Sequence, residues 1–263
     1  MYEFLTQGLK IAYFSAEHEQ RELLQRIAFL HAYKFKKQSG WVLPSANKWH
    51  RGERTEQDIE RINIVVDDMI KLPGEMVINK LGTWEDMMSV LATDKFDVCA
   101  VDYLSIMDMP GIKTQYRDDE VRKLVSEAAK LTDTYNNNEG IIFITPAQIN
   151  RDSKKNANKA KEGEKKYDLT AISKYSEMYQ AADFIWSLFS DDDMKAERKW
   201  LLEVHKVKGY PPPWYPVSIL LKDDTTDMVT ETNGTAGRYV EKSPLHHWIE
   251  DKTADDITQG AFA

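Results

Sequence analysis

Residues 97–104, Asp-Val-Cys-Ala-Val-Asp-Tyr-Leu, and residues 141–151, Ile-Ile-Phe-Ile-Thr-Pro-Ala-Gln-Ile-Asn-Arg, decide the fold of this chain. Each stretch is a short apolar run followed by a polar residue that chemistry could use, Asp102 after the first run and Gln148 after the second. Short, uninterrupted apolar runs are typical of buried strands in a parallel sheet. Nucleotide-binding α/β proteins use a carboxylate at the carboxyl end of such a strand to place a group near Mg²⁺. The pair therefore indicates an α/β protein with a nucleotide site.

The composition is that of a globular protein. The chain has 263 residues, enough for one large α/β domain or two small ones. Its 42% apolar and 30% charged residues argue against disorder, and no apolar run approaches the ~20 residues of a membrane span. Residues 1–10 contain no basic region followed by an apolar core, so no secretory signal is predicted. The single cysteine, Cys99, is interpreted as a core residue in a reducing, cytoplasmic compartment.

Charge is distributed unevenly along the chain. The net charge of −8 argues against a uniformly basic nucleic-acid binder but leaves room for a local basic groove. Residues 151–170 carry seven basic and four acidic side chains, so this segment is either a mobile loop that follows a nucleic-acid backbone or a solvated loop. Residues 241–263 carry two basic and five acidic side chains and are predicted to form a flexible acidic tail.

Strands alternate with helices early in the predicted element order, and strands follow one another later. This order predicts an α/β fold with a mostly parallel sheet and an antiparallel extension, in one domain over residues 1–240. Thr55 and Asp58 are expected to cap one helix, and Pro73-Gly74 to stop it. Strands are expected at 9–15, 76–79, 97–102, 140–145, 184–189, 200–207 and 217–222, and helices at 17–37, 55–70, 83–92, 118–135 and 172–182.

Three polar residues follow predicted parallel strands. Asp102 either holds the water shell of Mg²⁺ on a nucleoside triphosphate or caps a loop. Glu17 either polarises an attacking water or is a first-turn glutamate favoured by the helix dipole. Gln148 either contacts a γ-phosphate or is an ordinary polar loop residue.

Two lysines lie at the end of a predicted later strand. Lys206 and Lys208 alternate along the strand, so their side chains are expected on one face. They either reach phosphates, including those of a neighbouring subunit, or are edge lysines that discourage strand pairing. Residues 109–117, with Lys113 and Arg117, form a second and weaker candidate loop for nucleic acid.

Taken together, these residues resemble the ATPase domain of replicative DNA helicases of the DnaB type. Five segments follow the family's order and cover about residues 9–222. They are Phe14-Ser15-Ala16-Glu17, which resembles the segment of the family's catalytic glutamate; Val101-Asp102-Tyr103-Leu104, which resembles the Walker B strand; Ala147-Gln148-Ile149-Asn150-Arg151; Ala181-Ala182-Asp183 with the strand after it; and His205-Lys206-Val207-Lys208-Gly209, which resembles the family's Lys-x-Arg segment.

The resemblance implies a RecA-like three-layer sandwich that uses ATP and Mg²⁺. Glu17 would activate water, Asp102 would serve Mg²⁺ through water, and Gln148 would sense the γ-phosphate. Lys206 and Lys208 would act across the subunit interface of a homo-oligomer, a hexameric ring. Primase or a helicase loader would be further partners, in a bacterial cell or a phage-infected host. Loops at 108–117 and 151–170 would line a channel for single-stranded DNA through Lys113, Arg117, Arg151, Lys154, Lys155, Lys159, Lys161, Lys165 and Lys166.

Two departures from the family pattern stand out. The family's arginine is Lys208 here, which keeps the charge but lacks the planar fork that stabilises a transition state. No Gly-x-x-x-x-Gly-Lys-Ser/Thr occurs, so the Walker A phosphate loop, which precedes the first strand in this fold, is expected to be missing. The chain would then be a fragment or a degenerate relative, or would take the loop from another polypeptide. ATP binding by the chain alone is expected to be weak.

Two other functions remain compatible with these motifs. A non-catalytic RecA-like subunit could scaffold a replication or mobile-element complex. A RecA-type recombinase would form filaments instead of closed rings.

Overall fold

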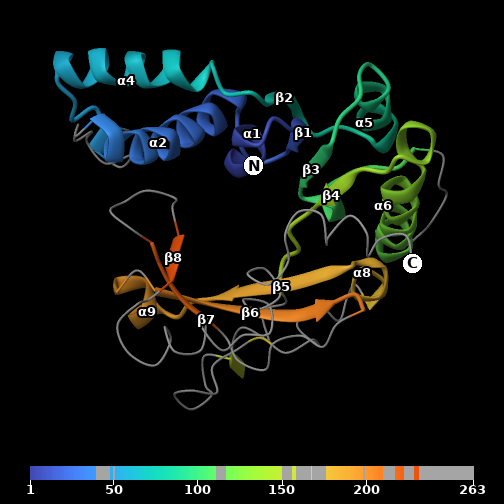
Figure 1. Ribbon diagram of the computed structural model, residues 1–263. Coiled ribbons are helices and arrows are strands. Elements are labelled where there is room, and N and C mark those ends of the chain that lie inside the picture. Colours follow the sequence, from blue (N-terminus) through green and yellow to red (C-terminus); the bar gives the residue numbers. More distant parts are fainter. Residues whose placement is uncertain are drawn as a thin grey trace. The chain divides into compact units, whose positions relative to one another are not determined.

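The computed structural model describes residues 1–39, 48–49, 51–110, 117–149, 156–157, 167, 176–197, 199–209, 217–221 and 228–230 (Figure 1). The chain divides into two compact units. The first comprises Met1–Arg151, Thr170–Ala182 and Asp223–Thr226, and the second comprises Asp152–Leu169, Asp183–Lys222 and Asp227–Ala263.

A parallel sheet organises the first unit. Its four strands lie in the order β2-β1-β3-β4, and every neighbouring pair is parallel. Parallel strands need a crossover between them, and the helices after β1, β2 and β3 supply it. The carboxyl ends of the strands therefore meet at one edge of the sheet. The strands are β1 Lys10–Ser15, β2 Glu75–Lys80, β3 Val98–Asp102 and β4 Ile142–Ile144.

The helices of this unit begin where capping residues predict. Thr55 and Asp58 form the expected capping box at the start of α4, and Thr83 and Asp86 form another at α5. After α6 the chain turns back at Gly140, whose φ is +83° and where a Cβ would lie 2.6 Å from the Thr132 carbonyl oxygen, so glycine is required. The helices are α1 Tyr2–Thr6, α2 Gln20–Ser39, α4 Glu56–Met69, α5 Trp84–Leu91, the 3₁₀ turn η1 Leu104–Ile106, α6 Arg117–Asn138 and α8 Ser176–Ala181.

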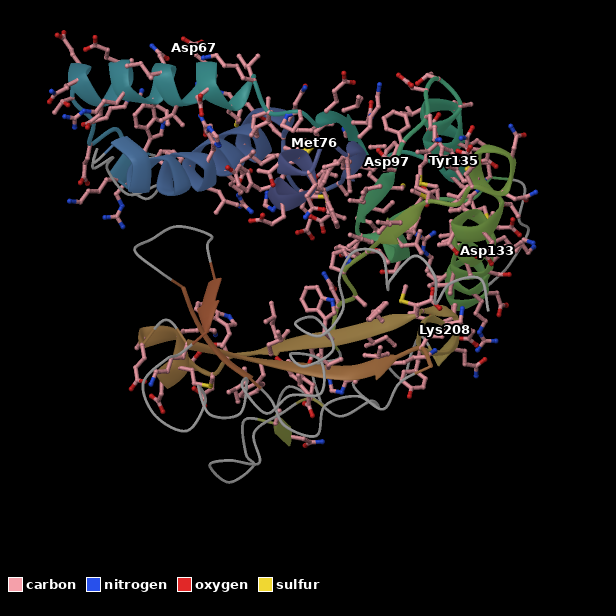
Figure 2. The ribbon with its side chains drawn as sticks, in the orientation of Figure 1. Asp67, Met76, Asp97, Asp133, Tyr135 and Lys208 are labelled. Atoms are coloured by element: carbon pink, nitrogen blue, oxygen red, sulfur yellow. The ribbon has the colours of Figure 1, made fainter. Side chains whose placement is uncertain are left out.

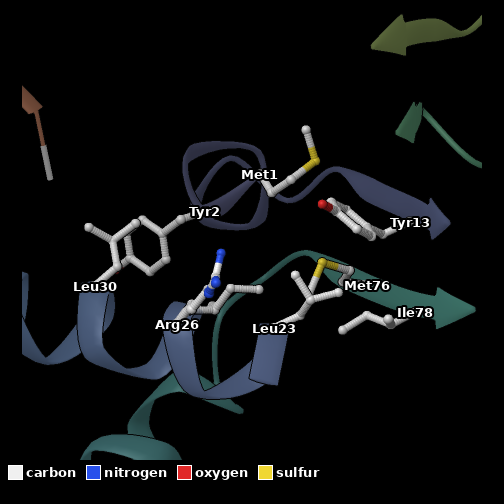
Figure 3. Close-up of a pocket in the computed structure, with 9 residues that line it drawn as sticks. Met1, Tyr2, Tyr13, Leu23, Arg26, Leu30, Met76 and Ile78 are labelled. Carbon is white, nitrogen blue, oxygen red and sulfur yellow. The ribbon is translucent and has the colours of Figure 1, made fainter. Parts of the chain in front are cut away.

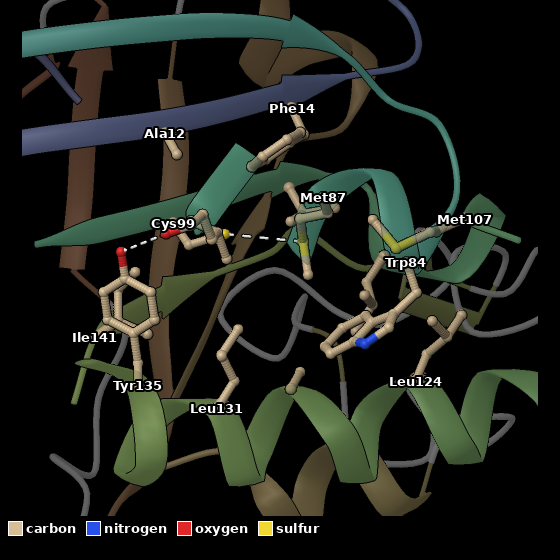
Figure 4. Close-up of a cluster of buried hydrophobic side chains, with 14 of the residues drawn as sticks. Ala12, Phe14, Trp84, Met87, Cys99, Met107, Leu124, Leu131, Tyr135 and Ile141 are labelled. Carbon is tan, nitrogen blue, oxygen red and sulfur yellow. Dashed lines mark hydrogen bonds between the residues drawn. The ribbon is translucent and has the colours of Figure 1, made fainter. Parts of the chain in front are cut away.

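The main core lies between one face of the parallel sheet and helices α5 and α6 (Figure 4). Phe14 and Cys99 come from the strands, and Cys99 Sγ lies 3.9 Å from Met87 Sδ of α5. Cys99 is fully buried, which confirms its interpretation as a core residue, and burial raises the pKa of its thiol to about 12. The Tyr135 hydroxyl accepts from the Phe96 N–H at 3.0 Å, and this bond joins the end of α6 to the residues before β3.

The opposite face of the sheet carries a smaller cluster. Leu5 of α1, Ile11 of β1 and Val98 of β3 are buried there. Asp97, directly before β3, accepts from the Lys10 N–H at 2.8 Å and aligns the starts of the two central strands (Figure 2).

The second unit contains an antiparallel sheet in the order β5-β6-β7-β8. A bulge lies between Ile185 and Trp186 of β5. Phe184 and Trp186 are 66% and 58% exposed, whereas Phe189 is buried against Tyr167, with ring centroids 5.2 Å apart. The elements are β5 Phe184–Phe189, α9 Asp192–Ala196, β6 Lys199–Val207, β7 Val217–Leu221 and β8 Met228–Thr230.

The predicted α/β class, mostly parallel with antiparallel strands, is confirmed, and the antiparallel strands pair in a sheet of their own. The sequence analysis missed α1, α9 and β8, all of three to five residues. Residues 241–263 lie outside the described part of the chain, so the domain limits 1–240 and 241–263 stay a prediction. Within the described ranges, the helices are too short or too polar to cross a membrane.

Candidate functional site

The turn that carries Glu17 is fixed against the end of β3. Ser15 and Asp102 are register partners, and the Ala16 N–H donates to the Asp102 carbonyl oxygen at 3.1 Å. The buried Ser15 Oγ accepts from the His18 N–H at 3.0 Å and closes the turn. The Glu17 side chain is exposed on this turn. The structure thus brings the turn of the predicted water-activating residue next to the predicted Mg²⁺ residue.

Asp102 ends β3 and is half-buried. The Tyr13 hydroxyl donates to Asp102 Oδ2 at 3.4 Å, a long hydrogen bond. Burial, followed by the charge of Asp102, raises the pKa of Tyr13 to about 12, so the phenol keeps its proton at neutral pH. Tyr13 therefore faces the carboxylate as a neutral donor and does not add negative charge to the site.

Charged side chains connect the Glu17 turn to α2. His18 Nδ1 lies 3.1 Å from Glu22 Oε2, and Arg26 donates to Glu22 Oε1 at 2.7 Å. The hydrogen bond with His18, together with the charge of Arg26, lowers the pKa of Glu22. Tyr13 and Arg26 line a cavity of about 230 Å³ whose lining is otherwise largely apolar (Figure 3). The lining residues are Met1, Tyr2, Tyr13, Leu23, Arg26, Ile27, Leu30, Met76 and Ile78.

Gln148 lies beyond β4, where it is held to the segment after β3. Its Nε2 donates to the Tyr103 hydroxyl oxygen at 2.9 Å, and Gln148 is exposed. The Leu104 N–H donates to Thr145 Oγ1 at 3.0 Å. The peptide between Asp102 and Tyr103 is cis. Gln148 and Asp102 are therefore joined through one neighbouring residue, Tyr103.

Lys206 and Lys208 belong to the second unit, whereas Glu17, Asp102 and Gln148 belong to the first. Lys206 lies within β6 opposite Ile185, and Lys208 follows the strand (Figure 2). Lys208 Nζ lies 2.7 Å from Asp183 Oδ1, and the Lys208 N–H donates to the Asp183 carbonyl oxygen at 2.8 Å. Asp183 thereby fixes the backbone at the end of the strand.

Arg117 is the one predicted DNA-binding residue whose position is described. Its guanidinium donates to the carbonyl oxygens of Ser105 and Met107 at 3.1 and 2.6 Å, and it pairs with Asp108 and Glu120. These contacts fix the segment after η1 to the start of α6. Its DNA-binding role stays a prediction. The others, Lys113, Arg151, Lys154, Lys155, Lys159, Lys161, Lys165 and Lys166, lie outside the described residues.

The sequence analysis did not single out Tyr13, Ser15, Tyr103 or Thr145. Tyr13 and Ser15 precede Glu17 at alternate positions of β1, and this period of two could have placed them on one face. Nothing in the sequence shows that Tyr103 bonds Gln148, or that Thr145 bonds the Leu104 N–H, across two strand ends.

Asp102 fits a magnesium site that is completed by water and phosphate. Among the described residues, no three His, Cys, Asp or Glu side chains are grouped as ligands of a metal ion. Mg²⁺ commonly keeps several waters and takes only one or two carboxylates together with phosphate oxygens. A single carboxylate at a strand end therefore suits this ion better than an all-protein cage would.

Comparison with known proteins identifies the fold and the family. The ATPase domain of G40P superimposes with a TM-score of 0.66 at 14% identity, over 88% of this chain and 77% of that one. A DnaB-like replicative helicase, studied with its interactions with primase, gives a TM-score of 0.62 at 15% identity, over 83% of this chain and 50% of that one.

These likenesses confirm the predicted RecA-like fold. This chain spans half of the second structure. No curated protein matches. The sequence model of the DnaB-like helicase C-terminal domain matches residues 2–209, most of the chain. The protein therefore belongs to the family of DnaB-like helicase C-terminal domains.

Proposed function

We propose that this chain is the motor core of a hexameric, ATP-dependent replicative helicase that moves along single-stranded DNA. One observation carries the proposal. The Glu17 turn, Asp102 and Gln148 lie at the carboxyl ends of β1, β3 and β4, which neighbour each other in the parallel sheet. Open α/β sheets bind ligands at this edge. Membership of the helicase family supports the same function.

The three residues have separate roles in this proposal. Glu17 polarises the attacking water, since its carboxylate is exposed on a fixed turn. Asp102 would hold Mg²⁺ through water, and the ion would neutralise phosphate charge when bound. Gln148 contacts the γ-phosphate with its side-chain amide. The neutral Tyr13 phenol keeps the Asp102 carboxylate in place.

The lysines after β6 act on a neighbouring subunit in the proposed ring. Lys206 and Lys208 would stabilise charge on the phosphates bound by the next copy of the chain. A lysine lacks the planar fork of arginine, so its contribution to the transition state is expected to be weaker. Primase or a helicase loader would bind the assembled ring, as the interaction with primase of the related replicative helicase suggests.

ATP is expected to bind weakly to the chain alone. Backbone N–H groups of a glycine-rich loop usually form the phosphate cradle, and the sequence contains no Gly-x-x-x-x-Gly-Lys-Ser/Thr. The second candidate is a non-catalytic RecA-like scaffold in a replication complex. Calorimetric titration with Mg²⁺ and ATP tests the point, because tight binding by the isolated chain would contradict the expectation.

Glu17→Gln in the full-length protein distinguishes the motor function from the scaffold function. The variant should lower ATP hydrolysis by about 10²–10⁴-fold, the usual contribution of a general base, while nucleotide affinity stays unchanged. Glu19→Gln is the matched control, because Glu19 is also exposed and lies two residues further on. Equal hydrolysis by the two variants would remove Glu17 from the mechanism. Absence of hydrolysis in the wild type would favour the scaffold.

The lysine-rich segment is the proposed contact to DNA. Neutralising Lys154, Lys155, Lys165 and Lys166 should weaken binding of single-stranded DNA and reduce its dependence on salt concentration, because fewer counterions are released. An unchanged salt dependence would argue against the contact. Electron micrographs distinguish the proposed rings from the filaments of a recombinase.

A further inference from the structure

Two hydrogen bonds connect the segment after β3 to the segment after β4. The Leu104 N–H donates to Thr145 Oγ1 at 3.0 Å, and Gln148 Nε2 donates to the Tyr103 hydroxyl oxygen at 2.9 Å. Leu104 is buried, whereas Gln148 is exposed and Tyr103 is half-buried. The first bond is therefore an internal anchor, and the second lies at the surface of the candidate site.

The hydrogen bond between Gln148 and Tyr103 leaves one hydrogen on each residue that can be donated to a ligand. A glutamine amide nitrogen carries two hydrogens, and Gln148 uses one of them on Tyr103. The Tyr103 oxygen accepts this bond and keeps its own hydrogen. Two donors, the Tyr103 hydroxyl and the second amide hydrogen of Gln148, thus sit on atoms that are 2.9 Å apart. A pair of neighbouring donors suits the oxygens of one phosphoryl group.

The hydrogen bond between the Leu104 N–H and Thr145 Oγ1 controls where the Tyr103 and Gln148 donors lie. Thr145 Oγ1 also lies 3.2 Å from the Pro146 carbonyl oxygen, to which its hydroxyl donates. With its hydrogen directed there, the hydroxyl oxygen presents a lone pair to the Leu104 N–H. The chain after Asp102 is therefore fixed to the chain that leads to Gln148, and the Tyr103 ring is held next to the amide.

We propose that Tyr103 is a second contact to the γ-phosphate beside Gln148, and that Thr145 is the positioning residue that holds the two together. This inference rests on the proposed function, because it takes a nucleoside triphosphate as the ligand. In this proposal the Tyr103 hydroxyl and the Gln148 amide distinguish a triphosphate from a diphosphate. The two groups are hydrogen-bonded to each other when no ligand is bound.

Tyr103→Phe tests the contact, because it removes the hydroxyl and keeps the ring. Nuclear magnetic resonance can follow the Gln148 side-chain amide while Mg²⁺ with a non-hydrolysable ATP analogue, or with ADP, is added at millimolar concentration. Tyr103→Phe should lower triphosphate affinity by about threefold to tenfold, the effect of one lost hydrogen bond, and leave ADP affinity unchanged. Tyr179→Phe, on α8 of the same unit, is the control for removing a tyrosine hydroxyl.

Thr145→Val and Thr145→Ser test the positioning role. Valine removes the acceptor of the Leu104 N–H, so the preference for triphosphate over ADP should fall, whereas serine keeps the hydroxyl and should restore it. A purely structural role would lower the affinity for both nucleotides equally. An equal loss, or a Tyr103→Phe variant with wild-type preference for triphosphate, would overturn the proposal.

The outcomes separate this inference from the proposed function. If the full-length wild type binds neither nucleotide, the ATPase function fails, and the phosphate contact fails with it. If the wild type prefers triphosphate and Tyr103→Phe keeps that preference, only the role of Tyr103 fails. In the nucleotide-free protein, Tyr103→Phe should also move the Gln148 amide resonances, and unchanged resonances would contradict the pairing itself.

Discussion

The parallel and the antiparallel sheet bury their strands to different extents. Four of the five residues of β3 are buried, whereas all nine residues of β6 are only half-buried. Strands of a parallel sheet are covered by their crossover helices, as β1 and β3 are by α5 and α6. The antiparallel strands leave Phe184 and Trp186 largely exposed. The parallel sheet therefore has its own buried core beneath the candidate site. Substitutions in this core and on the exposed antiparallel strands should affect stability to different extents.

The largest effect is expected from a core aromatic residue of the parallel sheet. Phe14→Ala should destabilise the protein by about 3–5 kcal/mol, because Phe14 is 2% exposed and leaves a cavity in the main core. Trp186→Ala, on the antiparallel sheet, should cost less than about 1 kcal/mol because the ring is already 58% exposed. Urea denaturation gives both values, and alkylation of Cys99 reports opening of the first unit. A Trp186→Ala cost as large as that of Phe14→Ala would mean that another surface covers β5.

A buried hydroxyl gives the next largest effect. Tyr135→Phe removes the acceptor of the Phe96 N–H and should cost about 1–3 kcal/mol, because that buried donor is left unpaired. Tyr167→Phe is the counterpart in the second unit and keeps the ring that packs on Phe189, so a smaller loss is expected. Thermal or urea denaturation of both variants checks the difference. Equal losses would show that the Tyr167 hydroxyl also has a structural role.

Substitutions at two helix caps should have smaller effects on stability. Thr83→Ala removes half of a reciprocal capping box on α5 and should cost about 1–2 kcal/mol. Asp191→Ala removes the N-cap bond to the Met194 N–H on α9 and should cost about 0.5–1 kcal/mol. Helix α5 buries Trp84 and Met87, whereas α9 buries no residue, so the first loss affects the core and the second does not. The reverse order in urea denaturation would contradict this account.

The capping box also predicts a dependence on pH. Hydrogen bonds from the Thr83 N–H and hydroxyl lower the pKa of Asp86 in the folded protein. The contribution of Asp86 to stability is therefore present above the unfolded-state pKa and is lost as the pH falls through the lower folded-state pKa. Thr83→Ala removes the hydroxyl bond and keeps the bond from the backbone N–H, so it should raise the pKa of Asp86 part of the way towards its ordinary value. Carboxyl resonances measured during an acid titration would show the change, and an unchanged pKa would mean that the backbone N–H holds the carboxylate without help from the hydroxyl.

The sequence predicted the buried half of the molecule well. Residues 98–101 are a continuous apolar run because both faces of β3 are covered, so burial is visible in the sequence itself. The capping pair Thr55 and Asp58 was also predictable, because its two residues are only three positions apart in the sequence.

Other features depend on contacts that no local pattern contains. Tyr103 and Gln148 are 45 residues apart, and their bond exists only because β3 and β4 pair. Arg117 was predicted to contact DNA from its charge and from the family resemblance, whereas its bonds to the Ser105 and Met107 carbonyl oxygens require the turn after β3. Short elements such as α9 carry too few apolar residues to show a period.

The smallest effect on stability, and the sharpest test of the second unit's function, is expected at Lys208. Its ion pair with Asp183 joins side chains that are 77% and 49% exposed, so Lys208→Gln should change stability by less than about 1 kcal/mol. The backbone bond from the Lys208 N–H to Asp183 remains in the variant. In the proposed ring, Lys208 must leave Asp183 to reach a neighbour's phosphates, and a weak, exposed pair allows that exchange at little cost.

Hydrolysis should therefore fall in Lys208→Gln although the fold is intact. Lys199→Gln is the control, because Lys199 begins the strand that Lys208 follows and pairs with Glu197 at 3.0 Å. The two variants should have similar urea midpoints but different rates of ATP hydrolysis in the full-length protein. Similar rates would mean that Lys208 is a surface residue that only pairs with Asp183. In that case only the parallel sheet would contribute residues to the catalytic site.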